Sequence, residues 1–360
     1  MPFEAGERII AHSTIMMSQI TSSRTEPAAV HAALDLGTNN CRLLVATPGG
    51  PDGFRVLDSY SRIVRLGEGL GATGALSPAA MDRALNALAV CQGKLARRPL
   101  RSARAVATEA CRRASNGAAF LQRAEEALGL PIEVITPREE AALAMESCAP
   151  LLRWGDRRAL LFDIGGGSTE IAWIRAPQEP DDLPSLIGYM SVPVGVVTVS
   201  EQAGRFCNTP DGFSALVEEL ASRLEPFDEV HRIRQEMRAG GVRLMGTSGT
   251  VTTLAGIVLD LPRYSRPRVD GQVLHCCDAD AALKWLQDTG RKGMAAHPCI
   301  GSERADFVLP GCAIFAAIRR TWPTASLTVC DRGLREGMLL RMMRGNRGQP
   351  ARRDAAFASA

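Results

Sequence analysis

Apolar and polar positions follow a clear pattern around a turn near the start of the chain. Residues 32–34 and 41–46 are short apolar stretches, and the polar turn Asp35-Leu-Gly-Thr-Asn-Asn40 lies between them. A short apolar run bounded by turn residues is typical of a buried strand. The pattern therefore predicts a strand, a tight turn and a returning strand.

The same pattern recurs in the second half of the chain. Residues 159–162 lead into Asp163-Ile-Gly-Gly-Gly-Ser-Thr-Glu170, and the apolar residues 171–174 follow. In both places an Asp after a buried strand is followed by Gly, by Ser or Thr, and by a returning strand. This repeat indicates two lobes that are built on one plan.

Helical and strand periodicity alternate along the rest of the chain, which favours an α/β fold. The boundary between the lobes is expected at Trp154-Gly-Asp156, so that the lobes cover residues 30–153 and 154–345. The predicted helices are 78–95, 120–128, 139–152, 213–224, 251–259, 278–286, 304–320 and 334–343. The further predicted strands are a short one ending at Thr108, 131–135, 242–245 and 327–329.

Length and composition agree with an ordinary globular protein of two domains. The chain has 360 residues, of which 46% are hydrophobic, so it can bury a large core. The net charge of +3 is too small to indicate nucleic acid or membrane lipid as a partner. No stretch approaches the roughly 18 apolar residues that a membrane span needs, so no membrane segment is expected.

The ten cysteines show no regular spacing and no C-x-x-C pair. Since the chain also shows no export signal, we expect reduced thiols in a cytoplasmic protein. Cys276 and Cys277 follow His275, but no second ligand pair lies at zinc-like spacing, so a half-buried strand is expected there. Residues 1–29 are expected to form a disordered leader, and residues 346–360 a flexible tail.

Three glycine-containing loops carry candidate phosphate-binding groups. Successive glycines let backbone N–H groups converge on an anion, and nearby hydroxyls add further donors. A lone glycine-rich turn is more often only a hairpin, but a second copy and a third loop at residues 246–250 favour a phosphate cradle. The expected phosphate contacts in these loops are Gly37, Thr38, Asn39, Gly165, Gly166, Gly167, Ser168, Thr169, Gly246, Ser248, Gly249 and Thr250.

The context of the two paired loops excludes two commoner nucleotide-binding motifs. A Walker loop needs Gly-Lys-Ser/Thr at the start of a helix, and a dinucleotide fingerprint needs G-x-G-x-x-G before a helix. The loops after Asp35 and Asp163 precede strands instead. In a closed two-lobe fold the two carboxylates would face each other across the cleft, where they could hold Mg²⁺ through water. A single Asp at such a turn would more often cap the backbone.

Transfer of a phosphoryl group to water needs an oriented nucleophile and cations that balance the phosphoryl charge. The candidate carboxylates are Glu139, Glu140 and Glu170. The first two begin a predicted helix, where negative charge is also favoured by the helix dipole, so the pattern alone does not choose between the two roles. The candidate cations are Arg42, Arg112 and Arg113, and spacing alone does not choose among them.

Six motifs together resemble the exopolyphosphatase and guanosine pentaphosphate phosphohydrolase family. They occur in the expected order from about residue 31 to 343. The motifs are Asp35-Leu-Gly-Thr-Asn-Asn-Cys-Arg42, Ala107-Thr-Glu-Ala-Cys-Arg112 with Asn116, Arg138-Glu-Glu-Ala141, Asp163-Ile-Gly-Gly-Gly-Ser-Thr-Glu170, Gly246-Thr-Ser-Gly-Thr250 and Asp331-Arg-Gly-Leu-Arg-Glu-Gly337.

The resemblance implies two actin-like lobes with an active-site cleft between them. It also implies release of terminal phosphate from inorganic polyphosphate, from guanosine pentaphosphate or from both, with Mg²⁺. Glu140 would be the base for the attacking water, and Asp163 and Glu170 would support metal and water. Asp35 would belong to the first loop and to the metal site, and Arg42 and Arg112 would steady the phosphoryl charge. A homodimer is also implied.

The chain departs from the family pattern in two places. Pro137 stands where the family often has Gly before the Glu pair, which stiffens the approach to Glu140. The chain also stops soon after the last motif, which resembles the short two-lobe subclass and favours short polyphosphates or a nucleotide as substrate.

Two alternatives of other classes stay open at this point. One is an ATP-dependent kinase or conformational ATPase of the same fold, with residues 246–250 at the adenosine. The other is a non-catalytic sensor that binds guanosine tetraphosphate or pentaphosphate.

Overall fold

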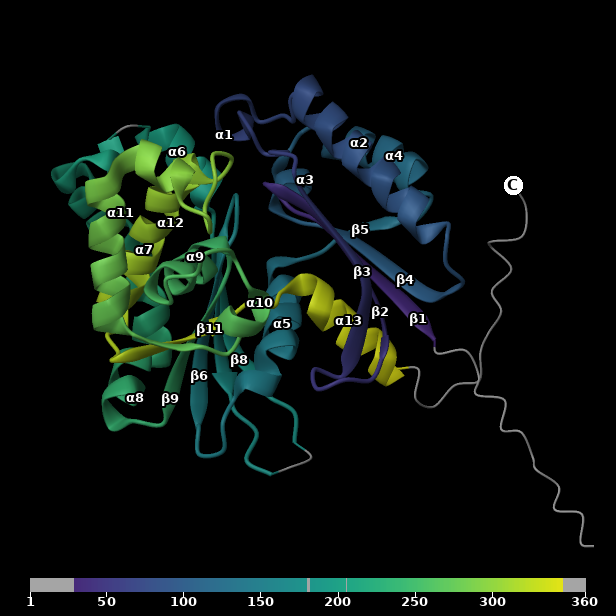
Figure 1. Cartoon of the computed structure of the whole chain (residues 1–360). Helices are drawn as coiled ribbons and strands as arrows, with labels where there is room; N and C mark the ends of the chain where they lie inside the picture. Colours follow the sequence, from purple (N-terminus) through teal and green to yellow (C-terminus); the bar gives the residue numbers. More distant parts are fainter. Residues whose placement is uncertain (1–28, 180–181, 205, 346–360) are drawn as a thin grey trace, which may run out of the picture.

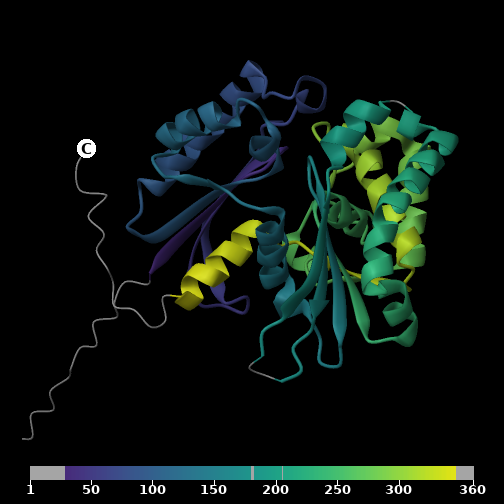
Figure 2. The ribbon, with the colours of Figure 1, turned by 180° about the vertical axis from the view of Figure 1, so that it is seen from behind.

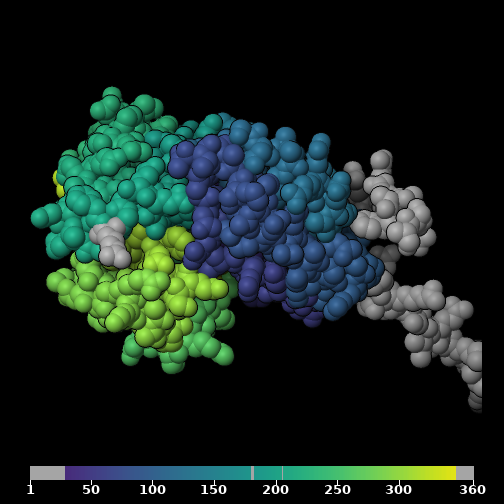
Figure 3. Space-filling model, turned by 90° about the horizontal axis from the view of Figure 1, so that it is seen from above, coloured from purple at the N-terminus to yellow at the C-terminus, as the bar shows by residue number. Residues whose placement is uncertain are grey.

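The computed structural model describes residues 29–179, 182–204 and 206–345. In these residues the chain forms two α/β lobes, each built on one β-sheet (Figure 1). Seen from above, the two lobes lie side by side and touch (Figure 3). The expected tail lies outside the described residues, as does the expected leader apart from residue 29.

The sheet of the first lobe has five strands in the order β3-β2-β1-β4-β5. β1, β2 and β3 form an antiparallel meander, and β4 and β5 continue the sheet parallel to β1. Its strands are β1 (Val30–Leu36), β2 (Asn40–Pro48), β3 (Phe54–Ile63), β4 (Leu100–Ala107) and β5 (Ile132–Val134).

The sheet of the second lobe repeats this plan with six strands in the order β10-β11-β9-β6-β7-β8. β6, β7 and β8 form the meander, β9 and β11 follow in parallel, and β10 adds an antiparallel edge. Its strands are β6 (Arg158–Ile164), β7 (Thr169–Arg175), β8 (Ser185–Val192), β9 (Val242–Thr247), β10 (Val273–His275) and β11 (Ser326–Cys330).

The repeat seen in the sequence is therefore a repeat of topology. Asp35 is the last residue but one of β1 and pairs with Arg42, and Asp163 is the last residue but one of β6 and pairs with Glu170, so both carboxylates occupy the same place in their sheets. The expected α/β class with two actin-like lobes is confirmed.

Helices cover the outer faces of the two sheets, and two more helices lie between the sheets. α2 and α4 pack on the outer face of the first sheet, and α6, α7, α9, α11 and α12 pack on that of the second. The helices are α1 (Leu70–Thr73), α2 (Pro78–Leu95), α3 (Glu109–Arg113), α4 (Gly117–Leu128), α5 (Pro137–Cys148), α6 (Val196–Ala203), α7 (Pro210–His231), α8 (Ile233–Ala239), α9 (Gly249–Val258), α10 (Arg266–Val269), α11 (Cys276–Ala296), α12 (Ala305–Thr321) and α13 (Leu334–Gly345).

The two helices between the sheets are α5 and α13 (Figures 1 and 2). Met338 and Leu339 of α13 pack with Leu143 of α5 on the inner face of the first sheet, so the last helix returns to the first lobe. Ala144 and Met145 of α5 pack on the inner face of the second sheet. α5 thus contacts both sheets, and its position is set by both lobes.

Pro137 fits the start of α5. It occupies the first turn, where its missing N–H costs no hydrogen bond, and the Thr136 hydroxyl accepts a hydrogen bond of 3.2 Å from the Glu139 N–H. The proline therefore fixes the entry into this helix without breaking it.

Some elements differ from the expectation. β10 ends at His275 and Cys276 begins α11, so the strand expected across Cys276 and Cys277 is wrong for these two residues. β3 and β8 were missed; both are edge strands that are half-buried or exposed along most of their length, β3 carries many polar residues, and Ser and Gly interrupt the apolar residues of β8. Within the part of the chain that the structure describes, no helix combines the length and the apolar character needed to cross a bilayer.

The core of the second lobe offers a direct test of the packing. Trp322 is fully buried, and its Nε1 donates a hydrogen bond of 2.8 Å to Asp228 Oδ1. We expect Trp322→Ala to lower the free energy of unfolding by about 3–5 kcal/mol, because it leaves a cavity and removes one of the two hydrogen bonds that Asp228 Oδ1 accepts. Trp154→Ala is the matched control, since Trp154 is 80% exposed. Equal losses in the two variants, measured by urea unfolding, would contradict this packing.

Candidate active site

A cavity of about 180 Å³ lies between the lobes, where the three predicted loops meet. Its wall also includes the start of α5, the first turn of α12 and the turn between β11 and α13. The predicted site residues on the wall are Asp35, Gly37, Thr38, Asn39, Arg42, Glu140, Asp163, Gly165, Gly166, Gly167, Ser168, Glu170, Ser248, Gly249 and Thr250. The fold thus brings most of the predicted site into one place.

The first two loops are equivalent hairpin turns. The Gly37 N–H donates to the Asn40 carbonyl at 2.9 Å, and the Gly165 N–H donates to the Ser168 carbonyl at 2.9 Å. Two tight turns of the same kind therefore end β1 and β6 at the cavity.

The two turns touch each other across the boundary between the lobes. A Cβ on Gly166 would lie 3.0 Å from the Asn39 Cβ, and one on Gly167 would lie 2.8 Å from the Thr38 Oγ1. A side chain at either position would push against the facing turn, so glycine at both positions lets the lobes approach this closely.

The third loop supplies a helix N-terminus. α9 begins at Gly249, directly after Ser248, whose side chain accepts a hydrogen bond from the Val251 N–H. Free backbone N–H groups and the helix dipole make such a terminus favourable for an anion. Gly249 and Thr250, in the first turn, lie on the cavity wall.

Four carboxylates share the cavity. Glu140 and Glu170 are each only 6% exposed, and Asp35 and Asp163 are half-buried. Burial and the charge of Glu170 raise the pKa of Glu140 to about 9 and the pKa of Asp163 to about 8. Burial also raises the pKa of Asp35 and the pKa of Glu170. Negative charge in this cavity is therefore costly without a cation.

Arg112 holds Glu140 in place. Its Nη1 donates to Glu140 Oε1 at 2.7 Å and to the Ile135 carbonyl at 2.6 Å, and its Nη2 donates to Glu109 Oε2 at 2.5 Å. Arg112 is not on the cavity wall, so its predicted contact with phosphate differs from its place in the structure. The guanidinium orients the carboxylate instead, because its donors are directed at protein acceptors.

Two further predicted contacts also differ from the expectation. The Thr169 hydroxyl donates to the Val194 carbonyl at 2.7 Å, and the residue is 2% exposed. A Cβ on Gly246 would lie 2.4 Å from the ring of Phe162, so this glycine serves core packing. Neither residue is on the cavity wall, because both belong to strands whose side chains are buried at these points.

The cavity wall carries three arginines in different states. Arg42 and Arg304 form no side-chain hydrogen bond or ion pair with any residue that the structure describes, so both are available to an anion. Arg332 is held by Asp270 at 2.7 Å and by Asp52 at 2.8 Å. Its charge is therefore balanced within the protein.

Sequence reasoning missed several residues of the wall. Arg332 belongs to a motif that carries the family resemblance, so a signal existed, although the motif did not suggest a role. Arg304 and Phe307 lie at the start of α12, where nothing in the local pattern distinguished them. Thr247 and Asn40 lie within the predicted loops and could have been included.

The carboxylates suit a cation that is shared with a ligand. Asp35 Oδ1 is buried and has no hydrogen-bond partner in the structure. Among residues 29–345, the masked positions aside, no three Asp, Glu, His or Cys side chains are arranged to hold a metal by themselves. Mg²⁺ commonly takes one or two carboxylates and completes its shell with water and phosphate oxygens. Asp35, Asp163 and Glu170 could supply such ligands.

Comparison with known proteins agrees with this site. The model of the Ppx/GppA phosphatase family matches residues 45–346. A guanosine-5'-triphosphate,3'-diphosphate pyrophosphatase of Photobacterium profundum is 29% identical over 328 residues. That alignment covers 89% of this chain, which spans only 60% of the length of the relative.

Solved structures show the same fold. The Aquifex aeolicus member of the Ppx/GppA family is 26% identical with a TM-score of 0.72, over 90% of this chain and 100% of that one. An exopolyphosphatase of Cytophaga hutchinsonii is 24% identical with a TM-score of 0.77, over 88% of this chain and 98% of that one, which shows likeness of fold alone. The chain belongs to the Ppx/GppA phosphatase family.

Proposed function

We propose that the protein hydrolyses a terminal phosphoanhydride and releases orthophosphate from inorganic polyphosphate, from guanosine pentaphosphate or from both. The observation that carries this proposal is the place of Glu140. This carboxylate is held by Arg112 on the wall of a cavity that two phosphate loops and the N-terminus of α9 also form. A base beside a phosphate-binding site can orient and deprotonate a water molecule, so we take water as the acceptor of the phosphoryl group.

In this proposal Glu140 orients the attacking water and takes its proton. A general base must be ionised, and it works best when its pKa lies near the working pH. Burial and the charge of Glu170 raise the pKa of Glu140 to about 9, so in this proposal a bound cation would lower this pKa and keep the carboxylate ionised. The oxygen of water then forms a bond to the terminal phosphorus as the bridging anhydride bond breaks. The shortened substrate leaves with the electron pair of that bond.

Charge on the transferred phosphoryl group needs donors that are already in place. The Gly37 and Gly165 N–H groups already close their turns, so the donors offered to phosphate are further N–H groups of the two turns and of the first turn of α9 on the cavity wall. Arg42 lies on the same wall, and its positive charge also acts on Asp35 and Asp163. In this proposal these groups receive the phosphoryl oxygens.

We further propose Mg²⁺ as the cation, with Asp35, Asp163 and Glu170 around it: one or two of these carboxylates would bind it directly and the others through water. Bound there, the ion would supply positive charge to phosphate oxygens and to the buried carboxylates. The unpartnered Oδ1 of Asp35 and the raised pKa of Asp163 support this assignment.

A direct assay distinguishes the two substrates, which present the same terminal anhydride. Purified protein with Mg²⁺ is incubated with polyphosphates of several lengths and, separately, with guanosine pentaphosphate, and released orthophosphate is measured. The ratio of kcat/KM values assigns the substrate. Binding of these compounds without any phosphate release would contradict the proposed hydrolysis.

Glu140→Gln tests the assigned base. The amide keeps the size of the side chain but cannot take a proton, so we expect kcat to fall by about 10²–10⁴-fold while substrate binding is nearly unchanged. The same substitution at Glu225, which pairs with Arg234 in the second lobe, is the control and should leave kcat at the wild-type level. A wild-type kcat in Glu140→Gln would remove this residue from the role.

The carboxylate cluster also makes a prediction about stability without metal. The pKa values of Glu140 and Asp163 are raised in the folded state to about 9 and about 8, so folding retains protons that the unfolded chain releases at lower pH. The free energy of unfolding should therefore fall as the pH rises from about 4.5 to about 9. Added Mg²⁺ should offset this loss at the alkaline end.

Urea unfolding in the presence of EDTA, at several pH values in this range, measures the effect. The double variant Glu140→Gln with Asp163→Asn should show a flatter dependence, because it lacks the two titrating groups. A wild-type slope in the double variant would show that other groups cause the pH dependence.

A further inference from the structure

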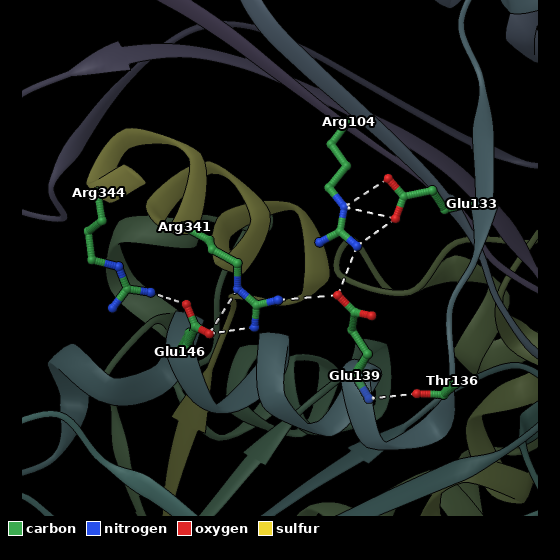
Figure 4. A network of polar contacts seen from close by, with 7 residues as sticks. All are labelled: Arg104, Glu133, Thr136, Glu139, Glu146, Arg341 and Arg344. Carbon is green, nitrogen blue, oxygen red and sulfur yellow. Dashed lines mark hydrogen bonds and ion pairs between the residues drawn. The ribbon is translucent and has the colours of Figure 1, made fainter. Parts of the chain in front are cut away.

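A network of charged side chains links one side of α5 to the first sheet and to α13 (Figure 4). Two members come from α5 itself, two from the first sheet and two from α13. We call this network the α5 clamp; its members are Arg104, Glu133, Glu139, Glu146, Arg341 and Arg344.

The clamp holds α5 at two levels. At its first turn, Glu139 Oε1 accepts from Arg104 Nη2 at 2.8 Å and from Arg341 Nη1 at 3.2 Å. Two turns later, Glu146 Oε1 accepts from Arg341 Nη2 at 2.5 Å, and its other oxygen pairs with Arg344. Arg341 therefore joins both levels of α5 to α13, while Arg104 joins the first turn to β4.

These pairs differ from ordinary surface ion pairs. The exposed fraction of the side chain is 18% for Arg104, 32% for Glu139 and 16% for Glu146, so water screens the Arg104–Glu139 pair only in part. The outer members are more open to water, with Arg341 and Arg344 at 40% and Glu133 at 57%. Arg104 also holds Glu133 at 2.7 Å, which fixes the guanidinium between two carboxylates. Exposed single pairs give little order, whereas a shared and half-buried network restricts the positions of its members.

The clamp lies on the face of α5 that adjoins the face carrying the proposed base. Consecutive residues of an α-helix point in directions about 100° apart. Glu139 is therefore directed at the clamp when Glu140 is directed at the cavity, and Glu139 itself is not on the cavity wall. Any rotation of the first turn of α5 that releases Glu139 also moves Glu140.

We propose that Glu139 is a positioning residue for the reaction. Through Arg104 and Arg341 it fixes the rotation of the first turn of α5, and so it places the Glu140 carboxylate opposite the phosphate loops. This inference rests on the proposed function of the cavity. Glu139 is assigned no contact with substrate, and its effect is exerted entirely through its neighbour.

Kinetics of two variants test this role. A misplacement of about 1 Å can cost about 10²-fold in rate, so we expect Glu139→Ala to lower kcat by at least about tenfold, with KM changed by less than about twofold. Glu139→Gln keeps a carbonyl oxygen at the same distance for the two arginines and should recover most of the lost kcat. Glu225→Ala, which removes another half-buried carboxylate from its arginine, should behave as wild type.

Hydrogen exchange gives a second measurement that does not depend on activity. Peptides that cover the first turns of α5 should exchange faster in Glu139→Ala than in wild type or in Glu225→Ala. If Glu139→Ala does not fold, Arg341→Gln replaces it. This variant removes the link from Glu139 to α13, while Arg104 still holds Glu139. Its kcat and its hydrogen exchange are measured in the same way.

The outcomes separate this inference from the proposed function. An inactive wild type would refute the proposed function, and hydrogen exchange would then still decide whether the clamp orders α5. A wild-type kcat in Glu139→Ala, or an unchanged exchange of α5, would overturn the clamp. A large rise in KM at constant kcat would also overturn it, because that result would place Glu139 in substrate binding.

Discussion

Four carboxylates share a single cavity, and the rest of the site is arranged around their mutual repulsion. Burial and the neighbouring charge of Glu170 raise the pKa of Glu140 and that of Asp163 well above their ordinary values. Arg112 balances part of the charge from behind the wall, and Arg42 from within the cavity. A bound cation would balance the remainder, which links ligand binding to metal binding.

The same cavity exists only while the lobes are together. Each lobe contributes one glycine turn and one aspartate, and the turns approach so closely that Gly166 and Gly167 leave no room for a Cβ beside Asn39 and Thr38. The phosphate cradle is therefore a property of the pair of lobes. A movement that separated the turns would divide the carboxylates between two surfaces and admit water to them.

α5 links the carboxylates of the cavity to the packing of both lobes. Its apolar side packs on the inner faces of both sheets, its first turn carries Glu140 to the cavity, and its charged side lies against Arg104 and α13. The helix pair formed by α5 and α13 thus joins the two sheets and the site. In this arrangement the position of Glu140 depends on packing contacts from both halves of the chain.

Much of this protein could be predicted from local sequence patterns. Apolar stretches, turn residues and the repeated loops after Asp35 and Asp163 predicted the α/β class, the two lobes and most of the cavity wall. These features are local, since strand period, turn chemistry and glycine content depend on neighbouring residues. The edge strands β3 and β8 escaped prediction because their half-exposed positions lack a clear period.

The tertiary structure decided which candidates meet. The pattern could not choose between Glu139 and Glu140, because both begin the same helix; packing on two sheets turns Glu140 to the cavity and Glu139 to Arg104. In the fold Arg112 pairs with Glu140, and Arg304, at the start of α12, lies on the cavity wall although it is far from the loops in the sequence. Sequence alone determined the loops and the repeat, since these are local. Contacts between residues far apart in the chain required the folded molecule, because direction and distance arise only when both lobes pack on α5.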